Sequence, residues 1–118
     1  MSTTETPAEI ELEPEQIERL LEEEPQLQLI DVREDYEREA GHIAGSRHIA
    51  LVALATQAES IERDRSVVFY CRVGSRSLMA AQAFRASGFE AYTMAGGLVR
   101  WVSEGRPLCP EDGSVADH

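Results

Sequence analysis

The chain has 118 residues, a formal net charge of −11 at pH 7, and no lysine, so all 11 of its basic residues are arginine. A chain of this length is sufficient for one domain with one hydrophobic core. The net negative charge argues against binding to nucleic acids or anionic membranes, because both bind to positively charged protein surfaces.

The sequence also bears on where the protein works. Its first nine residues are polar and acidic, and no apolar run approaches the roughly 18 residues of a membrane-spanning helix. We therefore expect a cytoplasmic protein whose two cysteines, Cys71 and Cys109, are reduced thiols. We expect a flexible acidic segment at residues 1–9, one domain over residues 10–107, and a C-terminal tail at residues 108–118.

Strands and helices are predicted to alternate along the chain. Short segments containing apolar residues predict strands at residues 10–12, 27–32, 47–50, 67–70 and 89–94. Helical spacing, early Pro14 and the stop at Gly41 predict helices at residues 14–24, 34–40, 51–61, 77–86 and 98–104. This alternation predicts an α/β domain with a central, mainly parallel five-stranded sheet and helices on both faces.

The run from Val67 to Ser77 carries the clearest chemistry. The buried-type strand at residues 67–70 delivers Cys71 into a polar loop, and a helix is predicted to follow. Sites in parallel sheets form at the carboxyl ends of strands, which is where Cys71 lies. A thiol beside a helix N-terminus and two arginines is expected to ionise more readily than a free cysteine, and the thiolate is the attacking form.

The loop has the composition of an anion site. Gly74 permits backbone conformations that turn successive N–H groups inward, and hydroxyl and guanidinium donors surround it. We expect these N–H groups to cradle an anion and Ser77 to cap the helix. The alternative is that Cys71 is a structural, buried cysteine. The segment that would bind the anion consists of Arg72, Val73, Gly74, Ser75, Arg76 and Ser77.

Three motifs in register resemble single-domain rhodaneses, the thiosulfate sulfurtransferase-like family. The first is Cys-Arg-Val-Gly-Ser-Arg-Ser at residues 71–77. The second is Asp-Val-Arg-Glu at residues 31–34, with Glu37 and Gly-His-Ile-Ala-Gly at residues 41–45. The third is Gly96-Gly97 followed by Trp101. The resemblance covers about residues 10–107 and implies the rhodanese-like fold.

The resemblance also implies a mechanism. The Cys71 thiolate would take sulfane sulfur from a small anionic donor, thiosulfate or a persulfide, and hold it as a persulfide. It would then pass that sulfur to cyanide, a thiol or a sulfur-carrier protein. Of the two loop arginines, we expect Arg76 more than Arg72 to orient the donor.

The upstream motif is expected to support the fold. Arg33 and Glu37 are spaced for an ion pair, and Asp31 is expected to accept hydrogen bonds that organise its loop. His42 could act as a base for Cys71, but a helix-terminus cysteine needs no dedicated base, so a structural role is favoured. We expect no metal and no cofactor, because the histidines lack ligand spacing with the cysteines.

Two other functions are open from the sequence. A cysteine phosphatase or arsenate reductase on the same fold would need Cys-x5-Arg, but the sixth position after Cys71 is Ser77, and Arg76 stands one residue early. A non-catalytic rhodanese-like module could bind a partner or relay sulfur. Cys109 could accept sulfur from Cys71, protect it as a disulfide, or pack against the core, and the last is favoured.

Overall fold

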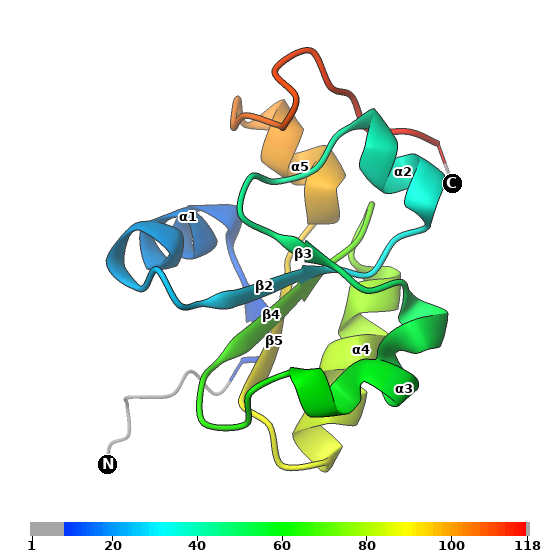
Figure 1. Ribbon diagram of the computed structural model, residues 1–118. Helices are drawn as coiled ribbons and strands as arrows, with labels where there is room; N and C mark the ends of the chain where they lie inside the picture. The colour runs from blue at the N-terminus through cyan, green and yellow to red at the C-terminus, as the bar shows by residue number, and fades with distance from the viewer. Residues whose placement is uncertain (1–8, 118) are drawn as a thin grey trace.

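A five-stranded, wholly parallel sheet forms the centre of the computed structural model, which describes residues 9–117 (Figure 1). The strand order is β1 (Glu11–Leu12), β5 (Ala91–Met94), β4 (Val67–Tyr70), β2 (Gln28–Asp31) and β3 (Arg47–His48). The predicted α/β class and five parallel strands are confirmed. The expected flexible N-terminal segment lies, apart from Glu9, outside the described residues.

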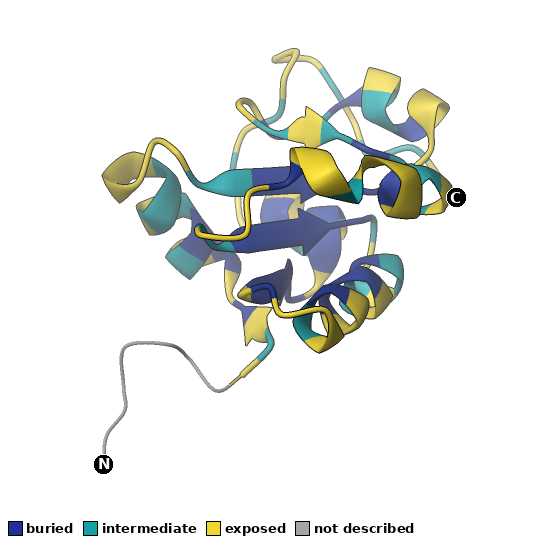
Figure 2. Ribbon diagram, turned by 60° about the horizontal axis from the view of Figure 1, so that its bottom comes forward, coloured by how far each residue is buried: buried dark blue, intermediate teal, exposed yellow. Residues whose placement is uncertain are grey.

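The central strand β4 shows that the sheet is buried on both faces. All four of its residues are buried, and side chains alternate between the faces of a strand. Val67 and Phe69 join one hydrophobic cluster, whereas Val68 and Tyr70 join the other. Figure 2 shows the buried strands between helices whose outer surfaces are exposed. Near-continuous apolar strands of this kind are typical of parallel sheets covered on both faces.

Helices cover both faces, as predicted. On one face lie α1 (Pro14–Glu23) and α5 (Gly97–Ser103), which contribute Ile17, Leu98 and Trp101 to their cluster. On the other face lie α3 (Leu54–Gln57) and α4 (Ser75–Ala86). The short α2 (Asp35–Ala40) follows β2 beyond the carboxyl end of the sheet (Figure 1). Within residues 9–117, no helix combines the length and apolar character needed to cross a membrane.

The single helix predicted at residues 51–61 is wrong. The segment is divided into the 3₁₀ turn η1 (Leu51–Ala53), α3, and the 3₁₀ turn η2 (Ala58–Ser60). The hydroxyls of Thr56 and Ser60 donate to carbonyls three residues earlier, at 2.9 and 2.6 Å. Such local hydrogen bonds compete with the α-helical pattern. The apolar face is also incomplete, since Val52 is 87% exposed.

Two predicted boundaries change near β4 and β5. The strand predicted from residue 89 begins at Ala91, because the Phe89 N–H donates to Phe84 and closes the end of α4. The helix predicted from Ser77 begins two residues earlier, at Ser75. The second change shortens the loop that follows Cys71.

The chain after residue 107 packs against α2 and is called here the C-terminal strap, residues 108–117. Its Cys109 forms an antiparallel bridge with His42, and the Ser114 N–H donates to the Ala40 carbonyl at 2.8 Å. Leu108 and Val115 pack against the α1–α5 cluster. The tail expected from the sequence is therefore a bound segment where the structure describes it.

Candidate functional site

Cys71 lies where β4 ends, at the carboxyl edge of the sheet. The register sets Asp31 of β2 beside Tyr70 and sets Thr93 of β5 beside Phe69. The ends of the three central strands therefore meet around Cys71. Its side chain is fully buried and belongs to the cluster on the α4 face.

The loop after Cys71 is short because α4 begins early. Gly74 is the residue that precedes the helix, and its φ of 106° is in the left-handed region that favours glycine. Ser75 and Arg76, which were predicted to precede the helix, form the first turn of α4 together with Ser77. Ser77 is therefore not the helix cap predicted from the sequence, although it still faces the sulfur.

Three donors converge on the sulfur of Cys71. Its Sγ atom accepts hydrogen bonds from the backbone N–H groups of Gly74 at 3.1 Å and Ser77 at 3.4 Å. The Ser77 hydroxyl contacts the same atom at 3.4 Å. That hydroxyl also lies 2.6 Å from the Thr93 hydroxyl and 3.3 Å from the Gly74 carbonyl oxygen. When Thr93 donates, the hydrogen of Ser77 can point at the sulfur or at that carbonyl.

These contacts separate Cys71 from an ordinary buried cysteine. A neutral thiol is a weak acceptor and gains little from three donors. A thiolate or persulfide is a strong acceptor, and unpaired N–H groups at a helix N-terminus stabilise negative charge there. Burial alone fits a structural cysteine, whereas three donors converging on one atom form the kind of arrangement that binds an anion.

Helix α5 supports the loop from the other side. The N–H of Leu98 donates to the Cys71 carbonyl at 2.9 Å, and the N–H of Val99 donates to the Arg72 carbonyl at 3.0 Å. Gly97 makes this approach possible, because a Cβ there would lie 2.4 Å from the Arg72 oxygen. The Gly-Gly motif was found in the sequence, but its contact with the loop was not predicted.

Arg76 is held by a buried carboxylate. Its two terminal nitrogens donate to the two oxygens of Glu37 at 2.9 and 3.0 Å, and the Glu37 side chain is fully buried. These hydrogen bonds raise the pKa of Arg76 despite the opposing effect of its partial burial. Glu37 also accepts from the Glu34 N–H in the capping box of α2. Arg76 therefore links α4 to α2.

Arg72 has a much looser partner. Its Nη2 atom lies 3.6 Å from Oδ1 of Asp117, whose side chain is fully exposed. Its Nε atom is buried and has no hydrogen-bond partner among the described residues. Arg72 therefore retains donor capacity next to Cys71. Val73, the following residue, exposes its side chain at the tip of the loop.

Asp31 and Arg33 form a buried network beneath this edge. Asp31 accepts from the backbone and side chain of Arg33 at 2.8–3.1 Å, and Tyr70 donates to it at 3.2 Å. Burial opposes the charge on Arg33, but its hydrogen bonds to Asp31 prevail and raise its pKa. The sequence predicted an ion pair between Arg33 and Glu37, but each has a different bidentate partner, Asp31 and Arg76.

His42 lies between α2 and the strap. Its Nδ1 atom lies 3.3 Å from the Arg38 carbonyl, and its backbone exchanges two hydrogen bonds with Cys109. His48 makes two contacts: its Nε2 atom lies 2.7 Å from the Arg33 carbonyl oxygen, and its Nδ1 atom lies 3.6 Å from Oδ1 of Asp35. These contacts hold both imidazole rings against the backbone near α2.

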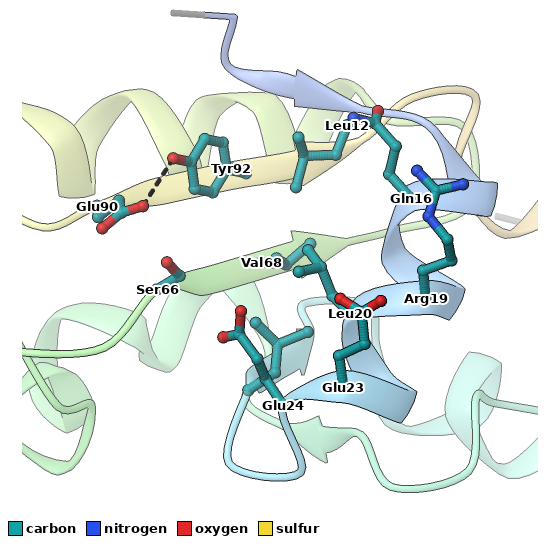
Figure 3. Close-up of a pocket in the computed structure, with 11 residues that line it drawn as sticks. Leu12, Gln16, Arg19, Leu20, Glu23, Glu24, Ser66, Val68, Glu90 and Tyr92 are labelled. Atoms are coloured by element: carbon teal, nitrogen blue, oxygen red, sulfur yellow. Dashed lines mark hydrogen bonds between the residues drawn. The ribbon is translucent and has the colours of Figure 1, made fainter. Parts of the chain in front are cut away.

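A separate cleft of about 280 Å³ lies beside α1, near the amino ends of the strands (Figure 3). Leu12, Leu20 and Val68 contribute apolar side chains, and Glu23 and Glu90 contribute carboxylates. It shares no residue with the loop at residues 71–77. The candidate site at Cys71, where the three donors converge, is therefore separate from this cleft.

Comparisons with known proteins identify the family of the domain. A family model described as Rhodanese-like domain matches residues 13–104. Thiosulfate sulfurtransferase GlpE of Pseudomonas aeruginosa is 34% identical over 105 residues, covering 88% of this chain and 90% of that protein. The putative sulfurtransferase YtwF of Bacillus subtilis is 34% identical over 87 residues, covering 74% of this chain and 84% of that protein.

A solved structure has the same architecture. The rhodanese-related protein from Thermoplasma volcanium aligns with a TM-score of 0.78 and 26% sequence identity. The alignment covers 85% of this chain and 97% of that chain. The match therefore extends across nearly the whole of that solved chain.

Proposed function

The chain belongs to the rhodanese-like domain family, and we propose that it is a sulfurtransferase in which Cys71 carries sulfane sulfur as a persulfide. The observation that carries the proposal is the convergence of Gly74 and Ser77 donors on the Cys71 sulfur. Two relatives with sulfurtransferase names support the general activity.

In the first half-reaction, the Cys71 thiolate attacks the outer sulfur of thiosulfate. A sulfur–sulfur bond forms at Cys71, the bond within thiosulfate breaks, and sulfite leaves with the electron pair of that bond. Three negative charges enter the step, and the persulfide and sulfite carry three away. The Gly74 and Ser77 N–H groups, which donate to the Cys71 sulfur, would stabilise the attacking thiolate, and the donors of the loop would stabilise the negative charge of the persulfide.

In the second half-reaction, a nucleophilic acceptor attacks the outer sulfur of the persulfide. Cyanide leaves as thiocyanate, whereas a thiolate becomes a persulfide, and the Cys71 thiolate is restored in either case. The physiological acceptor would be a small thiol or a sulfur-carrier protein. Two covalent half-reactions predict ping-pong kinetics.

We assign donor orientation to Arg72 rather than to Arg76. Arg76 already makes two hydrogen bonds with Glu37, so its guanidinium is committed to α2. Arg72 keeps an unpaired Nε and has one distant ion-pair partner. A reducing compartment such as the cytoplasm suits this chemistry, because both cysteines are free thiols in the structure.

Mass spectrometry tests the proposal directly. Incubation with thiosulfate should add one sulfur, about 32 Da, to the protein, and the sulfur should map to Cys71. Cys71→Ser should abolish both the mass gain and transfer to cyanide, while Cys109→Ser should keep them. A wild-type protein that stays unmodified with thiosulfate and with small persulfides would contradict catalysis and favour a binding module.

The same preparation tests the phosphatase alternative. Phosphatase chemistry would need an arginine free to bind a tetrahedral oxyanion, and Arg76 is both one residue early and held by Glu37. We expect no hydrolysis of an aryl phosphate. Aryl-phosphate turnover without sulfur transfer would reverse the assignment.

A further inference from the structure

The C-terminal strap brings a carboxylate to the active loop. Asp117 lies near the end of the strap, and its Oδ1 atom is 3.6 Å from Nη2 of Arg72, the residue that follows Cys71. The strap lies beyond residues 13–104, the segment matched by the family model. The contact is therefore made by a part of this chain outside the matched domain.

The strap is held in place along much of its length. Cys109 and His42 exchange backbone hydrogen bonds at 2.7 and 3.0 Å, and Ser114 donates to Ala40 at 2.8 Å. The approach at the end of α2 is close, since a Cβ at Gly41 would lie 2.7 Å from the Ser114 carbonyl oxygen. Figure 1 shows the strap running beside α2, and Asp117 near its end contacts Arg72 in the loop.

The contact with Arg72 is of a kind that another anion can replace. At 3.6 Å, Asp117 is too far from Arg72 for a good hydrogen bond, and its side chain is fully exposed to water. Exposed ion pairs of this type contribute about 0–1 kcal/mol, which corresponds to at most about a fivefold change in affinity. The buried Nε of Arg72 has no partner among the described residues and remains a donor.

We infer that Asp117 is a specificity-determining residue whose carboxylate competes with an anionic donor for Arg72. The inference rests on the proposed sulfur transfer. Asp117 selects most strongly against a small dianion such as thiosulfate and less strongly against donors with a smaller charge. Through Asp117, the strap thereby determines the relative affinity of the site for donors of different charge.

Kinetics of the Asp117→Asn variant test the inference. With thiosulfate, KM should fall by about two- to fivefold, with the change in KM rather than in kcat. With benzenethiosulfonate, which carries one negative charge, the fall should be smaller. Asp112→Asn removes the same charge from the same strap without the contact to Arg72, and it should leave KM unchanged.

Arg72→Gln completes a double-mutant cycle. It should raise KM for thiosulfate, and adding Asp117→Asn in that background should produce no further change. The inference is overturned if Asp117→Asn leaves KM unchanged, if Asp112→Asn lowers KM equally, or if the effect persists without Arg72.

The rate of alkylation at Cys71 tests the role of Asp117 without requiring catalytic turnover. Iodoacetate and iodoacetamide are similar in size but differ in charge, so the ratio of their rates at Cys71 reports the local preference for an anion. Peptide mapping separates Cys71 from the exposed Cys109. The ratio should rise in Asp117→Asn and not in Asp112→Asn. If wild type transfers no sulfur, the proposed function fails, but this ratio still supports or overturns the role of Asp117.

Discussion

The ion pair between Glu37 and Arg76 joins the first turn of α4 to α2. Glu37 is fully buried, and the side chain of Arg76 is 16% exposed. Burying a charge is costly, so removal of one member leaves the other without its main compensation. A substitution in α2 that removes this pair would therefore also disturb α4, the helix whose Ser77 N–H donates to Cys71.

Glu37→Gln should destabilise the protein strongly. The amide keeps an acceptor for the Glu34 N–H but removes the charge facing Arg76, so the free energy of unfolding should fall by about 3 kcal/mol. Urea unfolding measures this. Glu15→Gln removes an exposed partner of Arg19 and should change stability much less. Equal effects for the two variants would contradict a structural role for the buried pair.

At the residue scale, the sequence revealed the local part of the site. Cys71, Gly74 and Ser77 are neighbours in the chain, so a strand-to-helix pattern was enough to group them. The contacts of Thr93, Glu37 and Asp117 depend on how distant segments pack, and no local spacing encodes them. The bidentate contact between Arg76 and Glu37 was not predicted for the same reason, because the two residues are 39 positions apart in the sequence.

At the element scale, α5 acts as a support for the Cys71 loop. Its first N–H groups have no partners within the helix, and two of them bind the Cys71 and Arg72 carbonyls. This arrangement satisfies both the helix terminus and the loop. It requires close backbone contact, for which Gly97 leaves room.

Gly97→Ala should damage both stability and activity. The new Cβ would meet the Arg72 carbonyl at 2.4 Å in a backbone with φ of 64°. Strain and overpacking together should lower the free energy of unfolding by about 2–5 kcal/mol.

Gly105→Ala is the matched control. Its φ is 86°, but a Cβ there has no neighbour within 4 Å. Only the conformational strain of about 1–2 kcal/mol applies, and activity should be kept. Urea unfolding and persulfide formation measure both variants. A loss as small at Gly97 as at Gly105 would show that the loop and α5 can separate without cost.

Element prediction succeeded where burial and propensity agreed. β4 was predicted with its observed bounds, because four successive apolar residues lead into a polar loop. The segment at residues 51–60 mixes helix-forming residues with hydroxyl side chains that bond back to the chain, and the balance between those effects is decided by packing. The strap was missed because backbone hydrogen bonds to α2 leave no pattern in side-chain hydrophobicity.

At the scale of the whole molecule, two buried tyrosines make the stability of the fold depend on pH in the alkaline range. Burial, with a contribution from Asp31, raises the pKa of Tyr70 to about 12. Burial and the hydrogen bond to Glu90 also raise the pKa of Tyr92. A tyrosine in an unfolded chain has a pKa near 10, so the unfolded state loses these protons first. The stabilising contribution is complete below about pH 10 and is lost as pH rises toward 12.

Unfolding in urea between pH 8 and 11.5 tests this linkage. The free energy of unfolding should fall above about pH 10, with Tyr70 contributing up to about 1.4 kcal/mol per pH unit. Tyr70→Phe should be less stable at neutral pH, because it loses hydrogen bonds to Asp31 and Ile43, but should show a shallower decline. Parallel curves for the two proteins would contradict the linkage.

The pairing of β1 with β5 has a consequence for protein synthesis. Glu11 pairs with Thr93, and Leu12 pairs with Met94, so β1 cannot pair until β5, the last strand of this sheet in sequence order, has been synthesised. The same late segment brings the Thr93 hydroxyl to Ser77 and the α5 N–H groups to the Cys71 loop. A nascent or truncated chain therefore has the cysteine without its supporting contacts, and the completed sheet assembles the site.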